Sequence, residues 1–400
     1  MGKLEKGIPG YKRTIALIVA LGAAPPIATD LYLPALPQMT EVLDAPESLV
    51  SLTLTGFFMF MALGTLAFGP VSDKYGRKRP LIVAALMFSI FGLVSGLAPN
   101  VWVLIFARVL QGVGGGGMVA ISMALVKDCF EGRVREKVLV IIQAMGVIAP
   151  MCAPVMGSFV LLFADWHFTF FLQAFLGLAS LALILPFKES LDVSERTNEG
   201  IVRTIGRLFV VGRNKAFLVI LLMIAILGAP FMGYISCASY IYIDYFGLST
   251  FEYSAFFAAN AALSIVGAGL ALVIGGRIPV KHIITGVVGI SLAAGIALVA
   301  LGHASPFAFL ILFGVYALMG SVSRPFTTNI LLEQQDGDTG SASSLINFTC
   351  NIGGSLGMVA ATLPWPTYVL GLGSMIVIVS IIALVMWIVL LKSSTVIRGV

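Results

Sequence analysis

Charged residues are scarce in this chain. Asp, Glu, Lys and Arg make up 11% of its 400 residues, whereas 59% of the residues are hydrophobic, and the mean hydropathy is +1.03. Soluble globular proteins have about 25% charged residues. The composition therefore excludes a soluble globular protein and predicts an integral membrane protein.

Histidine and cysteine are also scarce. The chain has three histidines and four cysteines, and none of them forms a paired metal-binding spacing or a nucleophile and base arrangement. We interpret the cysteines as small buried hydrophobic residues. We therefore expect no enzyme, no metal site and no cofactor. The residues concerned are His167, His282, His303, Cys129, Cys152, Cys237 and Cys350.

Long apolar runs, in contrast, recur along the whole chain. About 20 apolar residues are needed to cross a bilayer as a helix. The runs are continuous and lack the short alternating pattern of a membrane barrel. We predict an all-α membrane protein with twelve transmembrane helices, at 13–38, 49–72, 79–97, 101–126, 137–163, 167–187, 215–240, 253–275, 281–302, 306–331, 341–364 and 367–391.

The basic residues are unevenly distributed between the predicted loops. With twelve spans, the clusters of Lys and Arg, such as 74–79, fall on the side of the two termini, and the opposite loops carry acids but no Lys or Arg. The positive-inside rule then places both termini in the cytoplasm. This distribution also explains the net charge of +5, so we expect no nucleic-acid partner.

A polar stretch in the middle of the chain divides the spans into six and six. We predict an N-terminal six-helix bundle at 1–187, a cytoplasmic linker at 188–214 and a C-terminal six-helix bundle at 215–400. The linker pattern at 201–209 predicts a short interfacial helix. The segments "FGPVSDKYGRKRPLI" and "VIGGRIPVKHII" join matching spans of the two halves. Two similar bundles around a central site are typical of transporters. A channel would need a symmetric filter, and the two halves of the sequence offer none.

Four motifs in four spans resemble one family. "GPVSDKYGRKRP" resembles the signature between the second and third helices of the major facilitator superfamily, and "RVLQGVGGG" resembles the motif of its proton-coupled members. "GVIAPMCAPVMGS" is similar to the antiporter motif of its drug exporters. Together with "DLYLPALP", the set most resembles the Bcr/CflA group of drug:proton antiporters. This resemblance implies two pseudo-symmetric six-helix bundles in the bacterial cytoplasmic (inner) membrane.

The resemblance also implies roles for two groups of residues. The first group is a conformational latch that pairs across the bundles on the cytoplasmic side, with glycines that permit close backbone approach. The second is the antiporter motif of the fifth span, which seals the closed cavity against proton leak. Its prolines remove backbone hydrogen bonds, and a structural kink is the alternative interpretation. The latch comprises Gly69, Asp73, Gly76, Arg77 and Asp128, and the antiporter motif comprises Gly146, Pro150, Pro154 and Gly157.

Asp30 and Arg108 are charged residues inside predicted spans, where charges are costly. Arg108 lies about seven residues from the outer end of its span, roughly 10 Å deep at 1.5 Å per residue. Asp30 lies about seventeen residues from the cytoplasmic start of the first span, which gives a similar depth. The two side chains are therefore able to meet, either as a structural ion pair or as part of proton coupling.

The first span favours the second interpretation. Pro34 leaves the carbonyl of Asp30 without its helical donor, and Pro25 and Pro26 do the same for two earlier carbonyls, so this helix needs protein partners or a wet cavity. A carboxyl group in a poorly hydrated cavity keeps its proton firmly, and a nearby guanidinium favours its release. A movement that changes either influence would load or unload a proton. We therefore predict that Asp30 and Arg108 are the proton-coupling residues.

The substrate site is expected between the halves near the bilayer midplane. Aromatic, Met and amide side chains suit a permissive apolar pocket. Some exporters of this kind have a second acid two turns before the first-span Asp, and Gly22 occupies that place here, which favours neutral or zwitterionic drugs such as amphenicols. The alternative substrate is an endogenous metabolite such as an amino acid or a sugar. The predicted substrate-binding residues are Asp30, Tyr32, Leu54, Phe57, Phe58, Met61, Met118, Ile142, Gly146, Phe231, Met232, Ile235, Asn347 and Asn351. The expected partners are the small-molecule substrate, protons and the lipid bilayer, and we expect a monomer.

Overall fold

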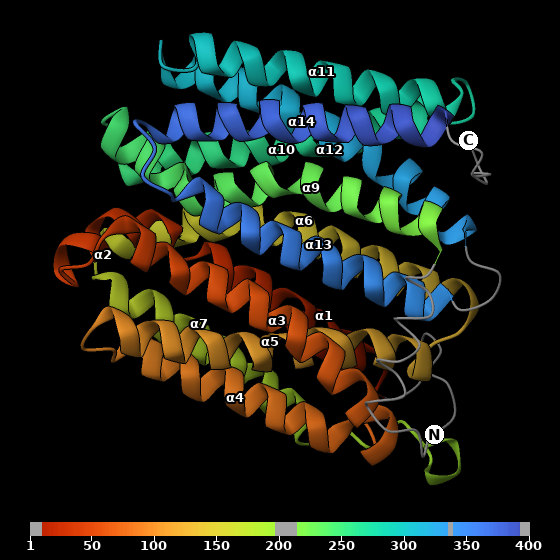
Figure 1. The fold of residues 1–400 in the computed structure, drawn as a ribbon. Helices are drawn as coiled ribbons and strands as arrows, with labels where there is room; N and C mark the ends of the chain where they lie inside the picture. The colour runs from red at the N-terminus through yellow and green to blue at the C-terminus, as the bar shows by residue number, and fades with distance from the viewer. Residues whose placement is uncertain (1–9, 197–213, 335–338, 393–400) are drawn as a thin grey trace. The chain divides into compact units, whose positions relative to one another are not determined.

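A computed structural model describes residues 10–196, 214–334 and 339–392, and every regular element in these ranges is helical (Figure 1). The internal contacts divide the chain into an N-terminal unit, Met1–Thr204, and a C-terminal unit, Ile205–Val400. This boundary falls inside the predicted linker 188–214. The interfacial helix predicted at 201–209 lies outside the described residues.

The N-terminal unit begins with a helix that is broken near its end. The predicted first span consists of three pieces: α1 (Tyr11–Asp30), the 3-10 helix η1 (Leu33–Ala35) and α2 (Leu36–Val42). The other five spans are single helices, and a short 3-10 helix follows them. These elements are α3 (Glu47–Tyr75), α4 (Lys78–Gly96), α5 (Val101–Cys129), α6 (Gly132–Leu161), α7 (Trp166–Ile184) and η2 (Val193–Glu195).

The C-terminal unit has the same number of long helices among its described residues. Its first span, α9 (Lys215–Ser239), continues into a π-helical stretch, η3 (Tyr240–Tyr245). The others are α10 (Thr250–Ile274), α11 (Val280–Leu301), α12 (Pro306–Glu333), α13 (Thr339–Ala361) and α14 (Tyr368–Lys392).

The twelve predicted spans correspond to these helices within the described ranges, which confirms the all-α fold. Ten of the described helical segments are long and apolar enough to cross a bilayer. The fifth span of each unit, α6 and α13, is outside that group. Among the described residues α6 contributes the shorter apolar helix Ile148–Leu161, and α13 is less apolar because it is rich in Ser, Thr, Asn and Gly. The chain is a multi-pass membrane protein.

Local sequence signals explain where several helices begin. The side chain of Asn100 accepts hydrogen bonds from the amides of Trp102 and Val103 at 3.1 and 3.0 Å, which caps α5. Ser249 and Glu252 form a capping box at the start of α10. Such caps supply partners for amides that have none within the helix.

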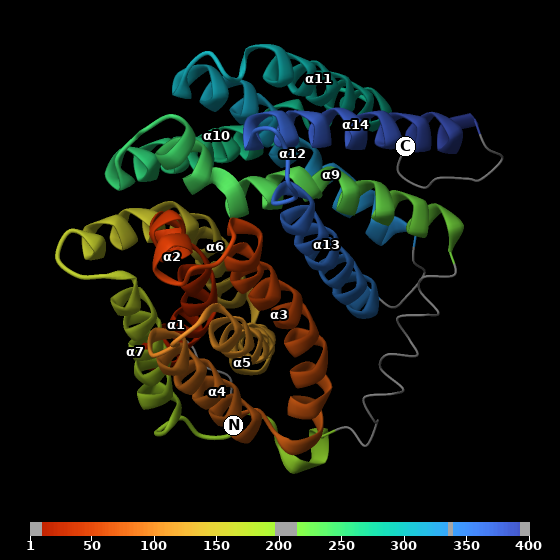
Figure 2. The same cartoon turned by 60° about the vertical axis from the view of Figure 1, so that its left-hand side comes forward.

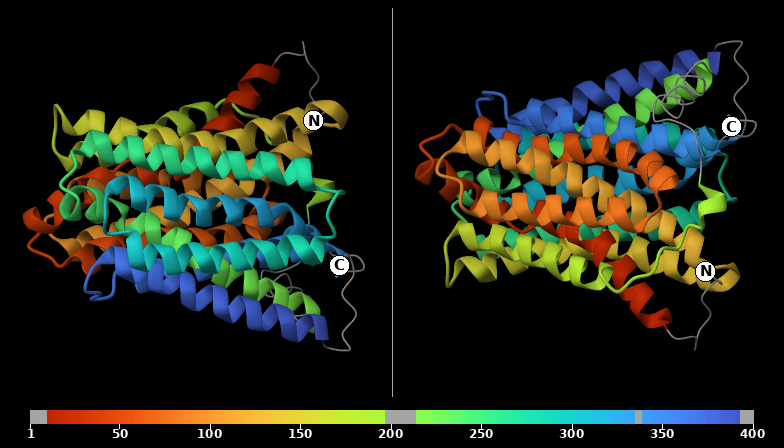
Figure 3. Two further views of the ribbon diagram at one scale, coloured as in Figure 1. Left: turned by 90° about the horizontal axis from the view of Figure 1, so that it is seen from above. Right: turned by 90° about the horizontal axis from the view of Figure 1, so that it is seen from below.

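The two units use the same pattern of helix contacts. The first and fifth spans pack together in each unit (α1 with α6, α9 with α13), as do the second and fourth (α3 with α5, α10 with α12) and the third and sixth (α4 with α7, α11 with α14). Figure 2 views α5 nearly end-on, with α1, α3 and α4 around it. In the left view of Figure 3, α12 lies between α10 and α11. This repeated pattern agrees with two related six-helix bundles.

Glycines permit these contacts to be close. A Cβ atom added at Gly64 of α3 would overlap the backbone carbonyl of Val113 in α5, and one at Gly267 of α10 would overlap that of Leu318 in α12. The second and fourth spans of both units therefore pack backbone against backbone. Small residues are a common way to bring membrane helices together.

Each unit has its own apolar interior and an apolar exterior. Phe57, Phe88 and Met118 belong to the core of the N-terminal unit, and Phe217 and Trp387 belong to that of the C-terminal unit. The outward faces are apolar too, since large side chains such as those of Trp102, Phe163 and Leu272 are 64%, 78% and 84% exposed. Apolar exposure on this scale is expected for surfaces that contact lipid.

Candidate functional site

Arg108 lies in the middle of a polar cluster inside the N-terminal unit. It is fully buried on α5. Its Nη1 atom donates hydrogen bonds to Oε1 of Gln111 at 2.8 Å and to Oε1 of Gln173 at 3.0 Å. Its Nη2 atom lies 3.4 Å from the carbonyl oxygen of Ala28, near the end of α1. Three residues, from α1, α5 and α7, therefore meet at the guanidinium group of Arg108.

Aromatic rings surround the same guanidinium. Its carbon lies 4.2 Å from the ring centre of Phe57, 4.8 Å from that of Tyr32 and 5.6 Å from that of Phe170. Thr53 donates its proton to the carbonyl of Val50, so the hydroxyl of Tyr32 is the donor in its 3.0 Å contact with Thr53. This bond fixes the tyrosine ring against the cation. Faces of aromatic rings stabilise a cation that is removed from water.

Asp30 and Arg108 do not form an ion pair among the described residues, which differs from the meeting that equal depth predicted. Asp30 is buried, and its Oδ1 atom has no hydrogen-bond partner in the described part of the chain. The reason is direction around the helix. At 100° per residue, Asp30 lies about 160° away from Ala28, whereas Tyr32 returns to the face of Ala28. Ala28 and Tyr32 therefore contact Arg108, and the carboxyl group between them points elsewhere.

The break in α1 explains how this arrangement forms. The helix ends at Asp30, and Pro34 lies within the following 3-10 turn. The last carbonyls of a helix lack donors from the helix itself, and Arg108 supplies one to Ala28. Gly157 of α6 lies directly against the broken segment, because a Cβ atom there would overlap the carbonyl oxygen of Leu31.

The antiporter motif is a continuous helix in the structure. α6 runs unbroken through Pro150 and Pro154, so the prolines do not divide it. Gly157 packs against α1 as described above, and the surroundings of Gly146 lie outside the described part of the chain. The predicted role of this motif as a seal stays a prediction.

The glycines of "RVLQGVGGG" position Arg108 through packing. Cβ atoms added at Gly112 and Gly116 would overlap the carbonyls of Phe57 and Met61 on α3. A Cβ atom at Gly114 would lie 2.6 Å from the amide nitrogen of Phe88 on α4. These contacts hold α5 against two neighbouring helices at the level of the guanidinium.

Arg77 forms a second charged cluster, at the turn between α3 and α4. Its Nη1 atom lies 2.5 Å from Oδ1 of Asp73 and 2.8 Å from Oγ of Ser72, and its Nε atom lies 2.8 Å from Oδ2 of Asp128 on α5. Burial lowers the pKa of Arg77, but the hydrogen bonds and charges of Asp128 and Asp73 outweigh it and leave that pKa above its ordinary value. These pairs lie within the N-terminal unit, so the expected pairing across the bundles stays a prediction.

Glu189 completes this cluster and was missed by the motif analysis. Its Oε1 atom accepts hydrogen bonds from the amides of Arg77, Ser190 and Leu191 at 2.7, 3.1 and 3.2 Å. Its Oε2 atom accepts from the amide of Lys78 at 3.1 Å. A carboxylate at a helix start satisfies free amides and complements the helix dipole. The segment after α7 is thus attached to the start of α4.

The two glycines of the predicted latch differ from each other. Gly76 has a φ of +89°, and a Cβ atom there would lie 2.5 Å from Oε2 of Glu189. Glycine is therefore required at 76 by both conformation and space. The close approach expected at Gly69 is not found, because a Cβ atom there would meet no atom within 4 Å.

The predicted substrate-binding residues of the N-terminal unit are mostly part of its interior. Leu54, Phe57 and Met118 are fully buried. Met61 and Ile142 are partly buried and pack against the core, and Phe58 is also partly buried. Phe57 and Tyr32 contact Arg108, which no pattern in the sequence indicated.

The predicted residues of the C-terminal unit lie on α9 and α13. Ile235 is buried, and Phe231 and Met232 are partly buried. A Cβ atom added at Gly354 would lie 2.7 Å from Cγ of Met232, so Met232 packs between the two helices. Asn347 is exposed and donates to the carbonyl of Ser343 on its own helix at 3.0 Å, and Asn351 is partly buried. The predicted residues belong to two units, and a shared cavity stays a prediction.

A buried aromatic cluster in the C-terminal unit was also missed. Tyr234 accepts a hydrogen bond from Nδ2 of Asn260 at 3.0 Å. Its ring lies 4.3 Å from the ring of Phe313 and 5.7 Å from that of Phe257, in stacked orientation. The amide of Asn260 therefore lies among buried aromatic rings. The helical spacing of these residues resembles that of any core, so the sequence carried no signal for the cluster.

The His, Cys, Asp and Glu residues of the described ranges lack the arrangement that a metal site requires. No group of three or more His, Cys, Asp or Glu residues there is placed to hold a metal ion. Cys129 and Cys237 are buried, but Cys350 is only partly buried and Cys152 is exposed, which corrects the expectation that all four are buried. Cys152 lies on α6, four residues from each of the exposed apolar residues Ile148 and Met156.

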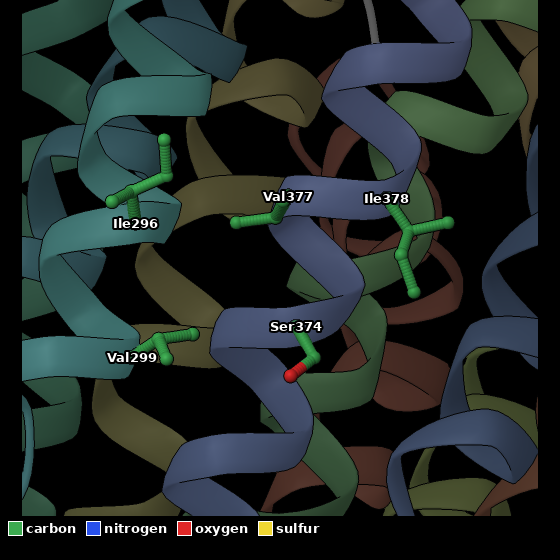
Figure 4. Close-up of a pocket in the computed structure, with 5 residues that line it drawn as sticks. All are labelled: Ile296, Val299, Ser374, Val377 and Ile378. Carbon is green, nitrogen blue, oxygen red and sulfur yellow. The ribbon is translucent and has the colours of Figure 1, made fainter.

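A shallow groove of about 410 Å³ lies between α11 and α14. Figure 4 shows Ile296 and Val299 of α11 beside Ser374, Val377 and Ile378 of α14. Ile296 and Ile378 are more than half exposed. The groove has an apolar lining and no charged group, as expected for a surface that contacts lipid chains.

Comparisons with known proteins agree with the motifs. Residues 20–358 match the Major Facilitator Superfamily. An uncharacterized MFS-type transporter of Bacillus subtilis, YdgK, is 31% identical over 87% of this chain and 89% of its own length. The multidrug resistance protein MdtL of Escherichia coli is 27% identical over 89% and 88%. A bicyclomycin resistance protein homolog of Haemophilus influenzae is 29% identical over 64% and 65%.

Solved structures show the same fold at low sequence identity. A D-xylose-proton symporter matches with a TM-score of 0.75 at 15% identity, over 98% of this chain and 99% of its own. The nucleoside transporter NupG matches with a TM-score of 0.73 at 12% identity, over 96% and 99%. With the family match covering most of the sequence and the twelve helices arranged in two units of like packing, the chain belongs to the Major Facilitator Superfamily and is a membrane transporter.

Proposed function

We propose that this protein is a proton-coupled antiporter that exports small, largely apolar drugs across the bacterial cytoplasmic membrane by alternating access. The observation that carries the proposal is Asp30. It is a buried carboxyl group with an unpaired oxygen, at the broken end of α1, in a unit whose buried cation is held by neutral groups. An intramembrane carboxyl group is costly unless it is used.

The drug class rests on relatives and on the first helix. Two relatives have names that refer to bicyclomycin resistance and multidrug resistance. Asp30 is the one acid of α1, and the place two turns before it holds Gly22, where a Cβ atom would lie 3.7 Å from Ile142. With one carboxyl group available for the proton, a neutral or zwitterionic substrate such as an amphenicol fits better than a cation.

The test uses inverted membrane vesicles that are energised only by a proton gradient. We expect uptake of chloramphenicol against its gradient, and loss of that uptake when a protonophore dissipates the gradient. Vesicles without this protein are the control. Absence of gradient-dependent uptake for chloramphenicol, florfenicol and bicyclomycin would contradict the proposal, and uptake of an amino acid or sugar in their place would establish the alternative, an endogenous metabolite transporter.

The same proposal includes the setting of the protein. Both termini lie in the cytoplasm, the chain works as a monomer in the lipid bilayer, and its partners are the substrate and protons. The distribution of basic residues supports this orientation. Labelling of single cysteines introduced at 10 and 392, from outside intact cells and after lysis, tests it.

A further inference from the structure

Gln173 holds a central place in the polar cluster around Arg108. It is fully buried on α7. Its Oε1 atom accepts hydrogen bonds from Nη1 of Arg108 at 3.0 Å and from Nε2 of Gln111 at 3.2 Å. One amide oxygen thus joins the cation to a second amide.

The packing around the amide pair supports a specific role. A Cβ atom added at Gly92 of α4 would lie 3.0 Å from Nε2 of Gln111 and 3.2 Å from Cα of Ala174, the residue after Gln173. Glycine therefore leaves room for the pair between α4, α5 and α7. Nε2 of Gln173 has no hydrogen-bond partner in the described part of the chain. A buried unpaired donor is costly, so the position is better explained by what its oxygen does.

The side chains that accept hydrogen bonds from Arg108 are neutral amides, and they affect its charge differently from a carboxylate. An amide oxygen orients a guanidinium group but leaves its charge uncompensated, and the charge then acts on other groups within reach. Asp30 is the acid of α1, two residues from both Ala28 and Tyr32, which contact Arg108. The direction in which Arg108 is held therefore decides how strongly its charge acts on Asp30.

We propose that Gln173 is a positioning residue for proton coupling: its amide oxygen holds the guanidinium of Arg108 toward α5 and α7, away from Asp30. The inference rests on the proposed function, since it concerns how Asp30 exchanges its proton. Gln111 assists from α5, but it lies on the same helix as Arg108, and Ala28 of α1 contributes only a backbone carbonyl at 3.4 Å. Gln173 is therefore the side chain that ties the cation to α7.

Other titratable groups near α1 are not placed to influence proton exchange by Asp30 as Arg108 does. At the depth of Asp30, α5 contributes Arg108 and the segment after α1 contributes Tyr32. The remaining titratable side chains of the elements that pack against α1 lie at helix ends, apart from Cys152, which is exposed on α6. Those at the ends are Glu47, Asp73, Lys74, Tyr75, Lys127, Asp128, Cys129, Arg133, Arg135, Glu136, Lys137 and His167.

The experiment is an infrared titration of the purified full-length protein in detergent. The carboxyl band of Asp30 is identified by its loss in Asp30→Asn, made in each background. In Gln173→Leu, the guanidinium loses its tie to α7 and becomes available to the carboxylate, so the titration midpoint of Asp30 should fall by about one pH unit, the lower end of the effect of a nearby arginine. Gln173→Asn shortens the side chain by one carbon, which moves the amide oxygen away from Arg108, and the midpoint of Asp30 should fall by less.

Gln173→Glu separates positioning from a purely structural role. It keeps the size and the acceptor oxygen of Gln173, and its negative charge binds Arg108 more firmly, so the midpoint of Asp30 should not fall. Ser180→Ala, on the same helix, removes a buried hydroxyl that bonds to Leu176 in its own helix at 2.9 Å, and it should leave the midpoint unchanged.

The inference is overturned if the titration midpoint of Asp30 in Gln173→Leu equals that of the wild type. It is also overturned if the midpoint falls as far in Gln173→Glu as in Gln173→Leu. If the Leu variant does not fold, the Asn variant decides, since an unchanged midpoint there has the same meaning. The titration needs no substrate, so its failure is distinct from failure of the vesicle assay. A protein that exports drug but shows no shift contradicts this inference alone.

Discussion

Glu189 is predicted to stabilise the N-terminal unit by fixing the start of α4. Its two carboxylate oxygens accept four backbone hydrogen bonds, from the amides of Arg77, Lys78, Ser190 and Leu191. Two of these amides belong to the start of a helix, and two belong to the segment that follows α7. Substitution of this one side chain should therefore loosen the contact between them.

The structure gives the size of the effect. In Glu189→Gln, the oxygen that accepts three bonds can remain, but an NH₂ group replaces Oε2 and faces the amide of Lys78, donor against donor. Loss of one hydrogen bond to a charged group costs about 2 kcal/mol, and the lost attraction to the helix start adds about 0.5 kcal/mol. For a unit of this size that corresponds to a fall in Tm of roughly 5–10 °C. Glu189→Ala removes all four bonds and should lower the Tm further.

Thermal unfolding in detergent, followed by the fluorescence of a thiol-reactive dye at the buried cysteines, measures this series. Glu41→Gln is the matched control, because Glu41 is exposed on α2, and its Tm should equal that of the wild type. A Glu189→Gln protein with the wild-type Tm would refute the reasoning, as would an Ala variant more stable than the Gln variant.

Three further predictions concern the charged clusters and the contact between α1 and α6. Asp73→Asn should cripple transport while drug binding stays measurable, because it alters a conformational contact; equal loss of binding in a folded protein contradicts this. Arg108→Lys should restore part of the transport that Arg108→Ala abolishes, since an ammonium cannot replace the planar fork that reaches Gln111, Gln173 and Ala28; full activity would show that charge alone suffices. Gly157→Ala should destabilise the protein by about 1–3 kcal/mol in unfolding measurements, because of the overlap with Leu31, whereas Gly289→Ala, where a Cβ atom meets nothing within 4 Å, should not.

Hydropathy predicted the helices well because the bilayer imposes one requirement on every span. Each needs enough apolar residues to cross it, and the described helices begin and end within several residues of the predicted spans. Pro34 indicated that the carbonyl of Asp30 lacks its helical donor, and α1 ends at that residue. Close approach was expected at Gly76, and a Cβ atom there would overlap Glu189. These are local properties of the chain, which a sequence expresses directly.

Side-chain partners were harder to predict because they depend on three-dimensional packing. Arg108 contacts Ala28 and Tyr32, on either side of Asp30 in the sequence. Equal depth does not describe the direction around a helix, however, and Asp30 and Arg108 do not pair in the described structure. Gln173 lies 65 positions after Arg108, and Glu189 lies 112 positions after Arg77. No short motif can express such separations.

The predicted lining residues illustrate the same difficulty. Aromatic and Met side chains suit a drug pocket and a packed interior equally well, and Phe57 and Met118 belong to the core of the N-terminal unit. The apolar character of a residue identifies neither alternative. The residues that surround a side chain distinguish a pocket from a packed interior, and Phe57 contacts the buried cation of Arg108.

The central claim is that Asp30 carries the proton that drives export, and one measurement tests it most directly. Inverted vesicles with Asp30→Asn, energised only by a proton gradient, are compared with wild-type vesicles for uphill uptake of chloramphenicol. The amide keeps the size of the carboxyl group but can neither bind nor release a proton. We predict that uphill uptake vanishes while chloramphenicol still binds to the purified variant. Uphill uptake by Asp30→Asn at the wild-type rate would contradict the account and show that the carboxyl group of Asp30 is structural.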